Sequence, residues 1–192
     1  DASGLPFPNL SSVCSNDDLA VQELMEGLIR MGHRRIAVIG GDRAVSDTTR
    51  RRLQGCMTAF QAHGIDFDPE TDYQSIRFSF EEGYKATKKL LKNNKDYTAI
   101  FAVSDVMTIG AIRALWEAGK KVPEDVSIIG LDGLAMGRYL IPQLSTVKQD
   151  FKAIALRSVQ ILLDCLEEDA PARHETVPFQ VLRSESIRSI SR

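Results

Sequence analysis

Apolar positions along the chain fall into two patterns that alternate with each other. Short continuous apolar runs predict buried strands, at 35–39, 74–78, 99–103 and 126–131. Between them, apolar residues recur at helical spacing and predict helices, at 17–31, 50–63, 81–93 and 107–118. Asp17 is suited to cap the first helix, and Gly32, Gly64 and Gly119 stand where helices end. Strands that alternate with helices in this way are typical of a Rossmann-like α/β fold, a parallel sheet flanked by helices.

The C-terminal part of the chain is predicted to contain a strand at 145–149, a helix at 151–167 and a last strand at 177–183. The helix carries apolar residues on more than one face, and such a helix requires burial on most sides. Residues 1–16 are irregular and Pro-rich and offer little to bury it against. We therefore expect that part of the natural partner lobe lies outside this chain.

Composition and charge narrow the class of protein. The 192 residues carry a net charge of -2, which gives the whole chain no electrostatic attraction to nucleic acid. No apolar run approaches the length of about 18 residues that spans a membrane, and the first residues lack the features of a signal peptide. Cys14, Cys56 and Cys165 are odd in number and widely spaced. We expect a cytoplasmic chain with no disulfide framework, metal site or membrane segment.

The common sequence signatures of enzymes are not found. There is no G-x-S-x-G elbow, no P-loop and no G-x-G-x-x-G motif, and the pair Gly40–Gly41 alone is too weak a signal for a phosphate site. His33, His63 and His174 lie far apart in the sequence, and no nucleophile has an evident base. We expect a protein that is not an enzyme and uses no cofactor.

Two predicted strands end in short polar clusters, Ser104–Asp105 and Asp132–Gly133. In open parallel sheets, ligands bind just beyond the carboxyl ends of the strands. The Asp132 carboxylate could accept hydrogen bonds from the hydroxyl groups of a polyol, or it could be a turn residue beside Gly133. Ser104 could contact a ligand or cap the helix that follows it, and Asp105 is the other candidate for the cap. These clusters predict the edge of a binding cleft.

Six segments of the chain carry recognisable motifs in a fixed order. They read G-H-R-R-I-A-V-I-G-G (32–41), R-R-L-Q-G-C-M-T-A-F (51–60), F-S-F-E-E-G-Y (78–84), V-S-D-V-M-T-I-G-A-I-R-A-L (103–115), V-P-E-D-V-S-I-I-G-L-D-G (122–133) and I-P-Q-L-S-T-V-K-Q-D (141–150). Together they resemble the ligand-binding core of the lactose-repressor (LacI/GalR) family of bacterial transcription regulators. The resemblance extends from Asp1 to about Ser186.

The resemblance implies a division into lobes. Proteins of this family have an N-terminal helix-turn-helix, a hinge helix and two Rossmann-like lobes of the periplasmic binding protein type I, joined by three crossovers. This implies that 16–148 and 178–192 form the complete C-terminal lobe. It also implies that 1–15 and 149–177 are parts of an incomplete N-terminal lobe. Operator DNA would then be contacted only through a helix-turn-helix that this chain does not contain.

The resemblance also places ligand-binding residues. Arg52 falls at the cleft arginine of the family, and its five donors suit hydroxyl groups, carboxylates or phosphates. Phe78 falls where the family places an aromatic side chain against the effector, on which sugar C–H faces or bases can pack. Asp132, which is placed at the cleft by its position after a buried strand, is expected to bind ligand together with them. The alternatives are a solvated helix charge for Arg52, as for its neighbours Arg50 and Arg51, and a core aromatic residue for Phe78.

Further contacts are expected at the rim of the cleft. Asp47 and Thr48 lie in the loop before the helix of Arg52 and could add carboxylate or hydroxyl contacts. Ser104 replaces the asparagine that is common in the family, so its contact is shorter. Gln149 lies at a crossover between lobes and could reach the ligand or hold the hinge. Asp1 matches a position at which the first lobe touches ligand.

The C-terminal lobe also forms the dimer surface in this family. The resemblance places it at one helix and at the segment after Asp132, with Ile109, Ile112, Arg113, Trp116, Met136, Tyr139 and Leu140. Apolar residues at helical spacing are more often core than interface. An apolar patch of this size on a surface would nevertheless be expected to find a partner, and a homodimer is the natural form.

We therefore predict the effector-sensing and dimerisation portion of a LacI-type transcription repressor that responds to a small molecule. A sugar or related polyol is favoured, and a nucleobase could use the same kinds of group. The sequence leaves open whether the effector induces or co-represses. The alternative is a periplasmic sugar-binding protein of a transporter, which shares the two-lobe fold. Unpaired cysteines and the I-P-Q-L-S-T-V-K-Q-D segment favour the regulator.

Overall fold

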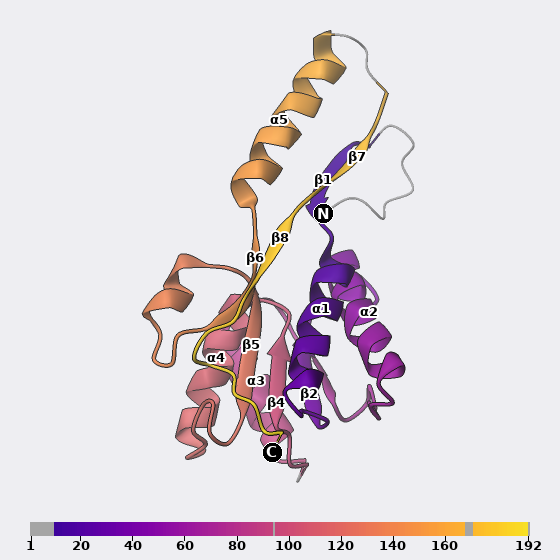
Figure 1. Cartoon of the computed structure of the whole chain (residues 1–192). Helices are drawn as coiled ribbons and strands as arrows, with labels where there is room; N and C mark the ends of the chain where they lie inside the picture. The colour runs from indigo at the N-terminus through magenta and orange to yellow at the C-terminus, as the bar shows by residue number, and fades with distance from the viewer. Residues whose placement is uncertain (1–9, 94, 168–170, 192) are drawn as a thin grey trace.

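A computed structural model describes residues 10–93, 95–167 and 171–191 (Figure 1). The elements of this part of the chain are β1 (Ser12–Ser15), α1 (Asp17–Arg30), β2 (Ile36–Gly40), α2 (Asp47–Ala62), β3 (Tyr73–Ser75), α3 (Phe80–Leu91), β4 (Ala99–Ala102), α4 (Asp105–Glu117), β5 (Ser127–Asp132), the 3-10 helix η1 (Ala135–Tyr139), β6 (Ser145–Gln149), α5 (Phe151–Glu167), β7 (His174–Val177) and β8 (Phe179–Leu182). The alternation predicted from the apolar pattern is present, with shifts of a few residues at the element ends.

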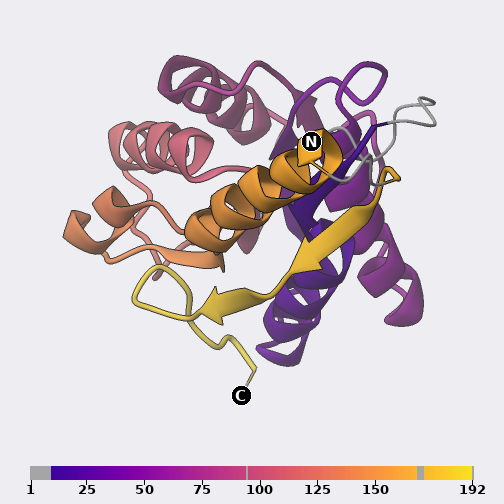
Figure 2. The ribbon, with the colours of Figure 1, turned by 90° about the horizontal axis from the view of Figure 1, so that it is seen from above.

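The main body is a six-stranded sheet in the order β3-β2-β4-β5-β6-β8. All neighbours pair in parallel except β8, which runs antiparallel to β6. Helices α1 and α2 pack together on one face and α3 and α4 on the other, as seen from above in Figure 2. Every residue of β2 and β4 is buried, which is the continuous apolar strand expected of a sheet covered on both faces. The predicted α/β fold is confirmed.

Serine hydroxyls fix where three of the helices begin. The side chains of Ser46, Ser79 and Ser104 each accept a hydrogen bond from the backbone N–H three residues later, at the start of α2, α3 and α4. The prediction that Asp17 caps α1 is wrong. The N-cap position is Asn16, which makes no capping bond through its side chain, and Asp17 is the first residue of the helix. The Asp17 carboxylate is engaged by a basic side chain of α2 instead.

A second, smaller body stands above the carboxyl edge of the large sheet (Figure 1). It consists of β1 and β7, which pair in parallel from Ser12 opposite His174 to Ser15 opposite Val177, and of α5, which packs against β1. The expectation that residues 1–16 are irregular is therefore wrong for the strand β1. The strand predicted at 177–183 is divided at Pro178, which has no N–H to donate, and its two halves join different sheets.

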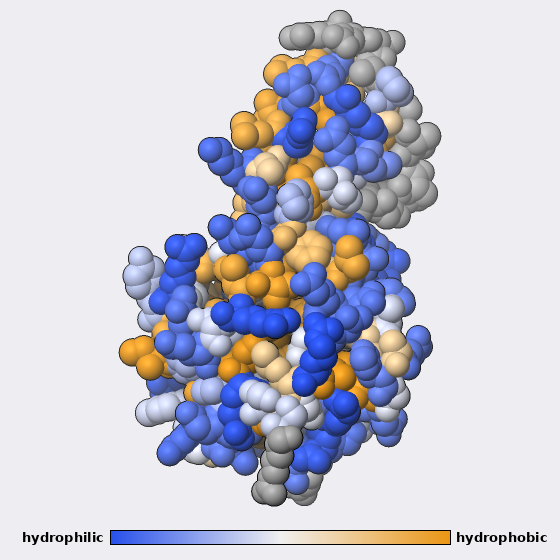
Figure 3. Space-filling view, in the orientation of Figure 1, coloured by the Kyte–Doolittle hydropathy of each residue, from blue (hydrophilic) through white to orange (hydrophobic). Residues whose placement is uncertain are grey.

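Helix α5 exposes a large apolar surface in this body. Figure 3 shows apolar side chains over the helix, above the main body. Its apolar residues that are at least half exposed are Phe151, Leu156, Val159, Leu162 and Leu166, whereas Ile161 is buried. The sequence indicated a helix with apolar residues beyond one face, and β1 and β7 cover only part of it. In the described residues, no helix combines the length and apolarity required to span a membrane.

Candidate functional site

The candidate site lies at the carboxyl edge of the six-stranded sheet. Strands β2, β4 and β5 are adjacent and parallel, so their last residues meet at one edge. Strand β6 is parallel to β5 and leads directly into α5. The same edge therefore faces the smaller body formed by β1, β7 and α5. Residues that are far apart in the sequence are brought together here, as the positions of Ser104 and Asp132 predicted.

Arg52 is the centre of the site. It lies on α2, is 5% exposed, and donates from Nε to Asp17 Oδ2 at 2.8 Å and from Nη1 to the carbonyl of Val103. Its Nη2 lies 3.6 Å from Asp132 Oδ1. The alternative of a solvated helix charge does not apply to Arg52. It applies to Arg50, whose side chain is 57% exposed.

Asp132 ends β5 in an unusual backbone conformation. Its φ is 128°, in the region that favours glycine, and a non-glycine residue there is held by its surroundings at a cost in strain. The carboxylate accepts a hydrogen bond from Gln149 Nε2 at 2.9 Å. Burial raises the pKa of Asp132 to about 6; the Arg52 guanidinium opposes the shift, and the Asp105 carboxylate adds to it. A mostly buried carboxylate with a perturbed pKa at a sheet edge is a typical feature of a functional site.

Ser104 and Asp105 have different roles from each other. The Ser104 hydroxyl is buried and accepts the Met107 N–H, so Ser104 is the helix cap and the interpretation of Asp105 as the cap is wrong. Asp105 is fully buried and accepts from Leu134 N and from Thr146 Oγ1, each at 2.7 Å. Burial raises the pKa of its carboxyl group. Asp105 thus joins the loop after β5 to β6, a role that no local sequence signal indicated.

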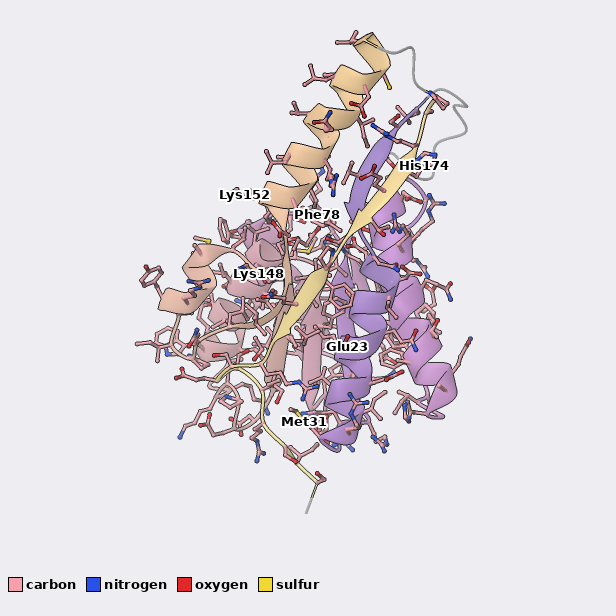
Figure 4. All side chains as sticks on the ribbon, turned by 45° about the horizontal axis from the view of Figure 1, so that its top comes forward. Glu23, Met31, Phe78, Lys148, Lys152 and His174 are labelled. Atoms are coloured by element: carbon pink, nitrogen blue, oxygen red, sulfur yellow. The ribbon has the colours of Figure 1, made fainter. Side chains whose placement is uncertain are left out.

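Phe78 lies between β3 and α3 and is 44% exposed, so the alternative of a core aromatic residue does not apply. A methyl group at Gly41 would lie 2.7 Å from its Cε2, so the ring packs directly on the bare backbone that follows β2. Phe78 also lines a hollow of about 790 Å³ with residues of the segments 41–46 and 75–82. Figure 4 shows Phe78 and Lys148 at the end of the main body that faces α5. Phe78 shares the sheet edge with Arg52 but not its hydrogen-bonded cluster.

The remaining residues that were predicted to contact ligand lie in different parts of the fold. The prediction that Asp47 and Thr48 lie in the loop before α2 is wrong, because the Ser46 cap starts the helix at Asp47. Asp47 Oδ1 pairs with Arg50 in the first turn. The buried oxygens Asp47 Oδ2 and Thr49 Oγ1 have no hydrogen-bond partner among the described residues. Gln149 bonds Asp132 at the last residue of β6. Asp1 lies outside the described residues.

The predicted dimer surface is an exposed apolar patch. Tyr139 is 86% exposed and Trp116 is 68% exposed, and the Arg113 guanidinium lies 4.7 Å from the centre of the Trp116 ring. Met136 is also exposed, whereas Ile109, Ile112 and Leu140 are half-buried. Ile141, which the sequence reasoning missed, is 96% exposed and borders a hollow of about 430 Å³ beside Trp116. Among the described residues, no group of His, Cys, Asp and Glu side chains is arranged to hold a metal ion.

Comparison with known proteins identifies the family. The periplasmic binding protein-like domain matches residues 25–187. The probable HTH-type transcriptional repressor ExuR of Bacillus subtilis (strain 168) is 33% identical over 159 residues, which cover 83% of this chain and 47% of ExuR. The solved complex of the transcriptional regulator CelR with cellobiose has a TM-score of 0.89 and 29% identity, covering 95% of this chain and 56% of that one.

A LacI family transcriptional regulator from Enterococcus faecium, solved with bound ribose, has a TM-score of 0.85 and 27% identity, covering 94% of this chain and 66% of that chain. The present chain spans about half the length of the curated relatives that it matches. The match to the domain family covers most of the chain, and the relatives confirm the resemblance seen in the six motifs. The chain therefore belongs to the periplasmic binding protein-like domain family, in the form carried by LacI-type transcription regulators.

Proposed function

We propose that this chain is the effector-sensing and dimerisation portion of a LacI-type transcription repressor that acts in the cytoplasm and responds to a small sugar. The observation that carries the proposal is the cluster of Arg52, Asp132 and Gln149 at the sheet edge that faces the smaller body. The cluster offers guanidinium and amide donors and a carboxylate acceptor side by side. Sugar hydroxyl groups both donate and accept hydrogen bonds, so such a cluster suits them.

The exposed Phe78 ring supports a sugar over a nucleobase only in combination with this cluster. Its ring can pack on the C–H face of a sugar or stack on a base. A hydroxyl group can donate to Asp132 while it accepts from Arg52, and a sugar carries several such groups around the C–H face that packs on an aromatic ring. CelR and the Enterococcus faecium regulator have been solved with cellobiose and ribose respectively, which supports a carbohydrate.

The two bodies of the fold support the lobe division expected from the family. The chain passes between them three times, at 15–17, 149–151 and 177–179. We assign 16–148 and 178–192 to the C-terminal lobe and 1–15 and 149–177 to the N-terminal lobe. Effector bound between the lobes would change their relative orientation and, through it, the spacing of two DNA-reading heads in a dimer. It acts only through its different affinity for the two arrangements.

The test is a thermal-shift screen of the full-length protein with sugars, polyols and nucleobases. A sugar should raise Tm, and Arg52→Ala and Asp132→Ala should abolish that shift, because each removes a hydrogen-bonding partner of the ligand hydroxyl groups. Arg50→Ala, on the same helix but in solvent, is the matched control and should keep the shift. A response to nucleobases alone, or one that survives both cluster variants, would refute the proposal.

A further inference from the structure

We propose that Asp17 is a specificity determinant that restricts the effector to uncharged polyhydroxyl compounds and excludes sugar acids and sugar phosphates. The inference deepens the proposed function and rests on it. Asp17 lies on α1, 35 residues before Arg52 in the sequence, and its side chain is 7% exposed. Its carboxylate occupies the Nε–H of Arg52 at 2.8 Å.

The contacts of Arg52 leave no edge of its guanidinium open to a second anion. An arginine binds a carboxylate or phosphate tightly when two neighbouring N–H groups point at it in parallel. Here Nε faces Asp17, Nη1 faces the carbonyl of Val103, and Nη2 faces Asp132 at 3.6 Å. Nε and Nη1 each donate a hydrogen bond to a protein oxygen, and Nη2 is ion-paired with Asp132 beyond hydrogen-bonding distance. The spare N–H groups can donate singly to a hydroxyl oxygen, but the two-point grip on an anion is not available.

The charges around the cluster give no positive excess to attract an anion. Asp17, Asp105 and Asp132 supply three buried or nearly buried carboxylates. Lys148 and Arg51 border the cluster. Together with Arg52 they supply three positive charges, which balance the three carboxylates. Arg51 donates to Cys14 Sγ and to the Ser15 carbonyl, and the Lys148 stem lies against Gly133.

The hydrogen-bonding capacity of Asp132 also favours a neutral ligand over an anion. The Asp132 carboxylate can only accept, so a ligand group beside it has to donate a proton. A hydroxyl group donates to Asp132 while it accepts from Arg52 or Gln149. A ligand carboxylate or ionised phosphate has no proton to offer and would stand against a like charge in a poorly solvated place. The cluster is thus complementary to neutral sugars and opposed to their acidic derivatives.

The test compares matched neutral and acidic ligands by calorimetry on the full-length protein at about pH 7.5. The probes are ribose with ribose 5-phosphate, glucose with glucose 6-phosphate and glucuronate, and cellobiose. The neutral member of a pair should bind at least about 100-fold more tightly than its acidic partner, since like charges at close range cost several kcal/mol. Asp17→Asn removes the negative charge beside Arg52, while its carbonyl oxygen can still accept the Nε–H, and should raise the relative affinity for the acidic partner by about tenfold or more. Asp18→Asn, at the exposed next position of the same helix, is the matched control and should leave the ratio unchanged.

The outcomes separate this inference from the function on which it rests. If wild-type protein binds an acidic sugar as tightly as its neutral partner, the role of Asp17 is refuted while a carbohydrate effector stands. If no carbohydrate of either kind binds, the proposed function fails and takes this inference with it. The ratio of neutral to acidic affinity in wild-type protein tests the inference even if Asp17→Asn does not fold. An Asp17→Asn protein that folds and keeps the wild-type ratio would also refute the inference.

Discussion

Replacing Asp132 by asparagine should make the ligand-free protein more stable at neutral pH. Burial raises the pKa of this carboxyl group from 3.8 to about 6, so the folded protein holds the proton more tightly than the unfolded chain. The resulting contribution to stability is complete below the unfolded pKa of 3.8 and is lost as the pH rises through about 6. At neutral pH wild-type protein therefore carries the cost of a buried charge that an asparagine cannot acquire.

The expected gain in the free energy of unfolding follows from the shift in the pKa of Asp132. A shift of about two pKa units at about 1.36 kcal/mol each gives about 3 kcal/mol as an upper bound. The opposing effect of Arg52 is already contained in this shift. Asparagine keeps a carbonyl oxygen for Gln149 and tolerates the positive φ, but its NH2 group cannot accept hydrogen bonds as the replaced oxygen did. We expect a net gain of about 2 kcal/mol, which for a chain of this length raises Tm by about 4–8 °C. The same variant should lose affinity for effector, because the carboxylate acceptor is gone.

The assay is urea denaturation of wild type and Asp132→Asn at several pH values from about 4 to 8. The stability difference should be smallest at about pH 4, just above the pKa of 3.8 in the unfolded chain, and should grow to its full size by about pH 7.5. Asp66→Asn, at an exposed position, is the control and should change stability by no more than about 0.5 kcal/mol. A variant that is less stable than wild type at neutral pH, or a difference that does not vary with pH, would refute the reasoning.

Three further changes test the cluster, the packing and the surface. Arg52→Met leaves the buried Asp17 carboxylate without its cation and should lower the free energy of unfolding by about 3–5 kcal/mol in urea denaturation. This loss of stability should be smaller in acid, and an effect below about 1 kcal/mol would contradict the ion pairing. Gly110→Ala places a methyl group against the Phe80 carbonyl where α3 and α4 meet, and it should lower the free energy of unfolding by about 1–3 kcal/mol or more. An unchanged Tm would show that the two helices can move apart without cost. Tyr139→Glu, at an 86% exposed position, should turn the proposed dimer into monomer in sedimentation equilibrium with its fold intact; an unchanged mass would count against this face as the interface.

The sequence was sufficient to predict the sheet and the convergence of three site residues. Parallel strands share a carboxyl edge, so a polar residue after each buried run is placed with its counterparts whatever the distance in sequence. Ser104 and Asp132 follow such runs and meet at that edge, and Arg52 reaches the same edge from the helix that follows β2. The hydropathy pattern was enough to place Ser104 and Asp132, whereas Arg52 was placed by the family resemblance.

Contacts that depend on side-chain direction could not be predicted in this way. Asp17 had the local character of a helix cap, and only the packing of α1 against α2 turns its carboxylate toward Arg52. Likewise, Asp105 reaches Thr146 across the sheet. Strand β1 reads Ser-Val-Cys-Ser, too short and too polar for a hydropathy signal, and it forms because β7, about 160 residues later, pairs with it.

Two of the site contacts lie next to the segments that join the two bodies, and this position links ligand binding to lobe orientation under the proposed function. Asp17, which holds Arg52, is the first residue of α1 after the passage from β1. Gln149, which holds Asp132, is the last residue of β6 before the passage to α5. A rotation of one body against the other moves these segments and so changes which donors and acceptors face the ligand. By reciprocity, a ligand that prefers one arrangement of the cluster favours the matching rotation, and no separate pathway through the core is required to couple them.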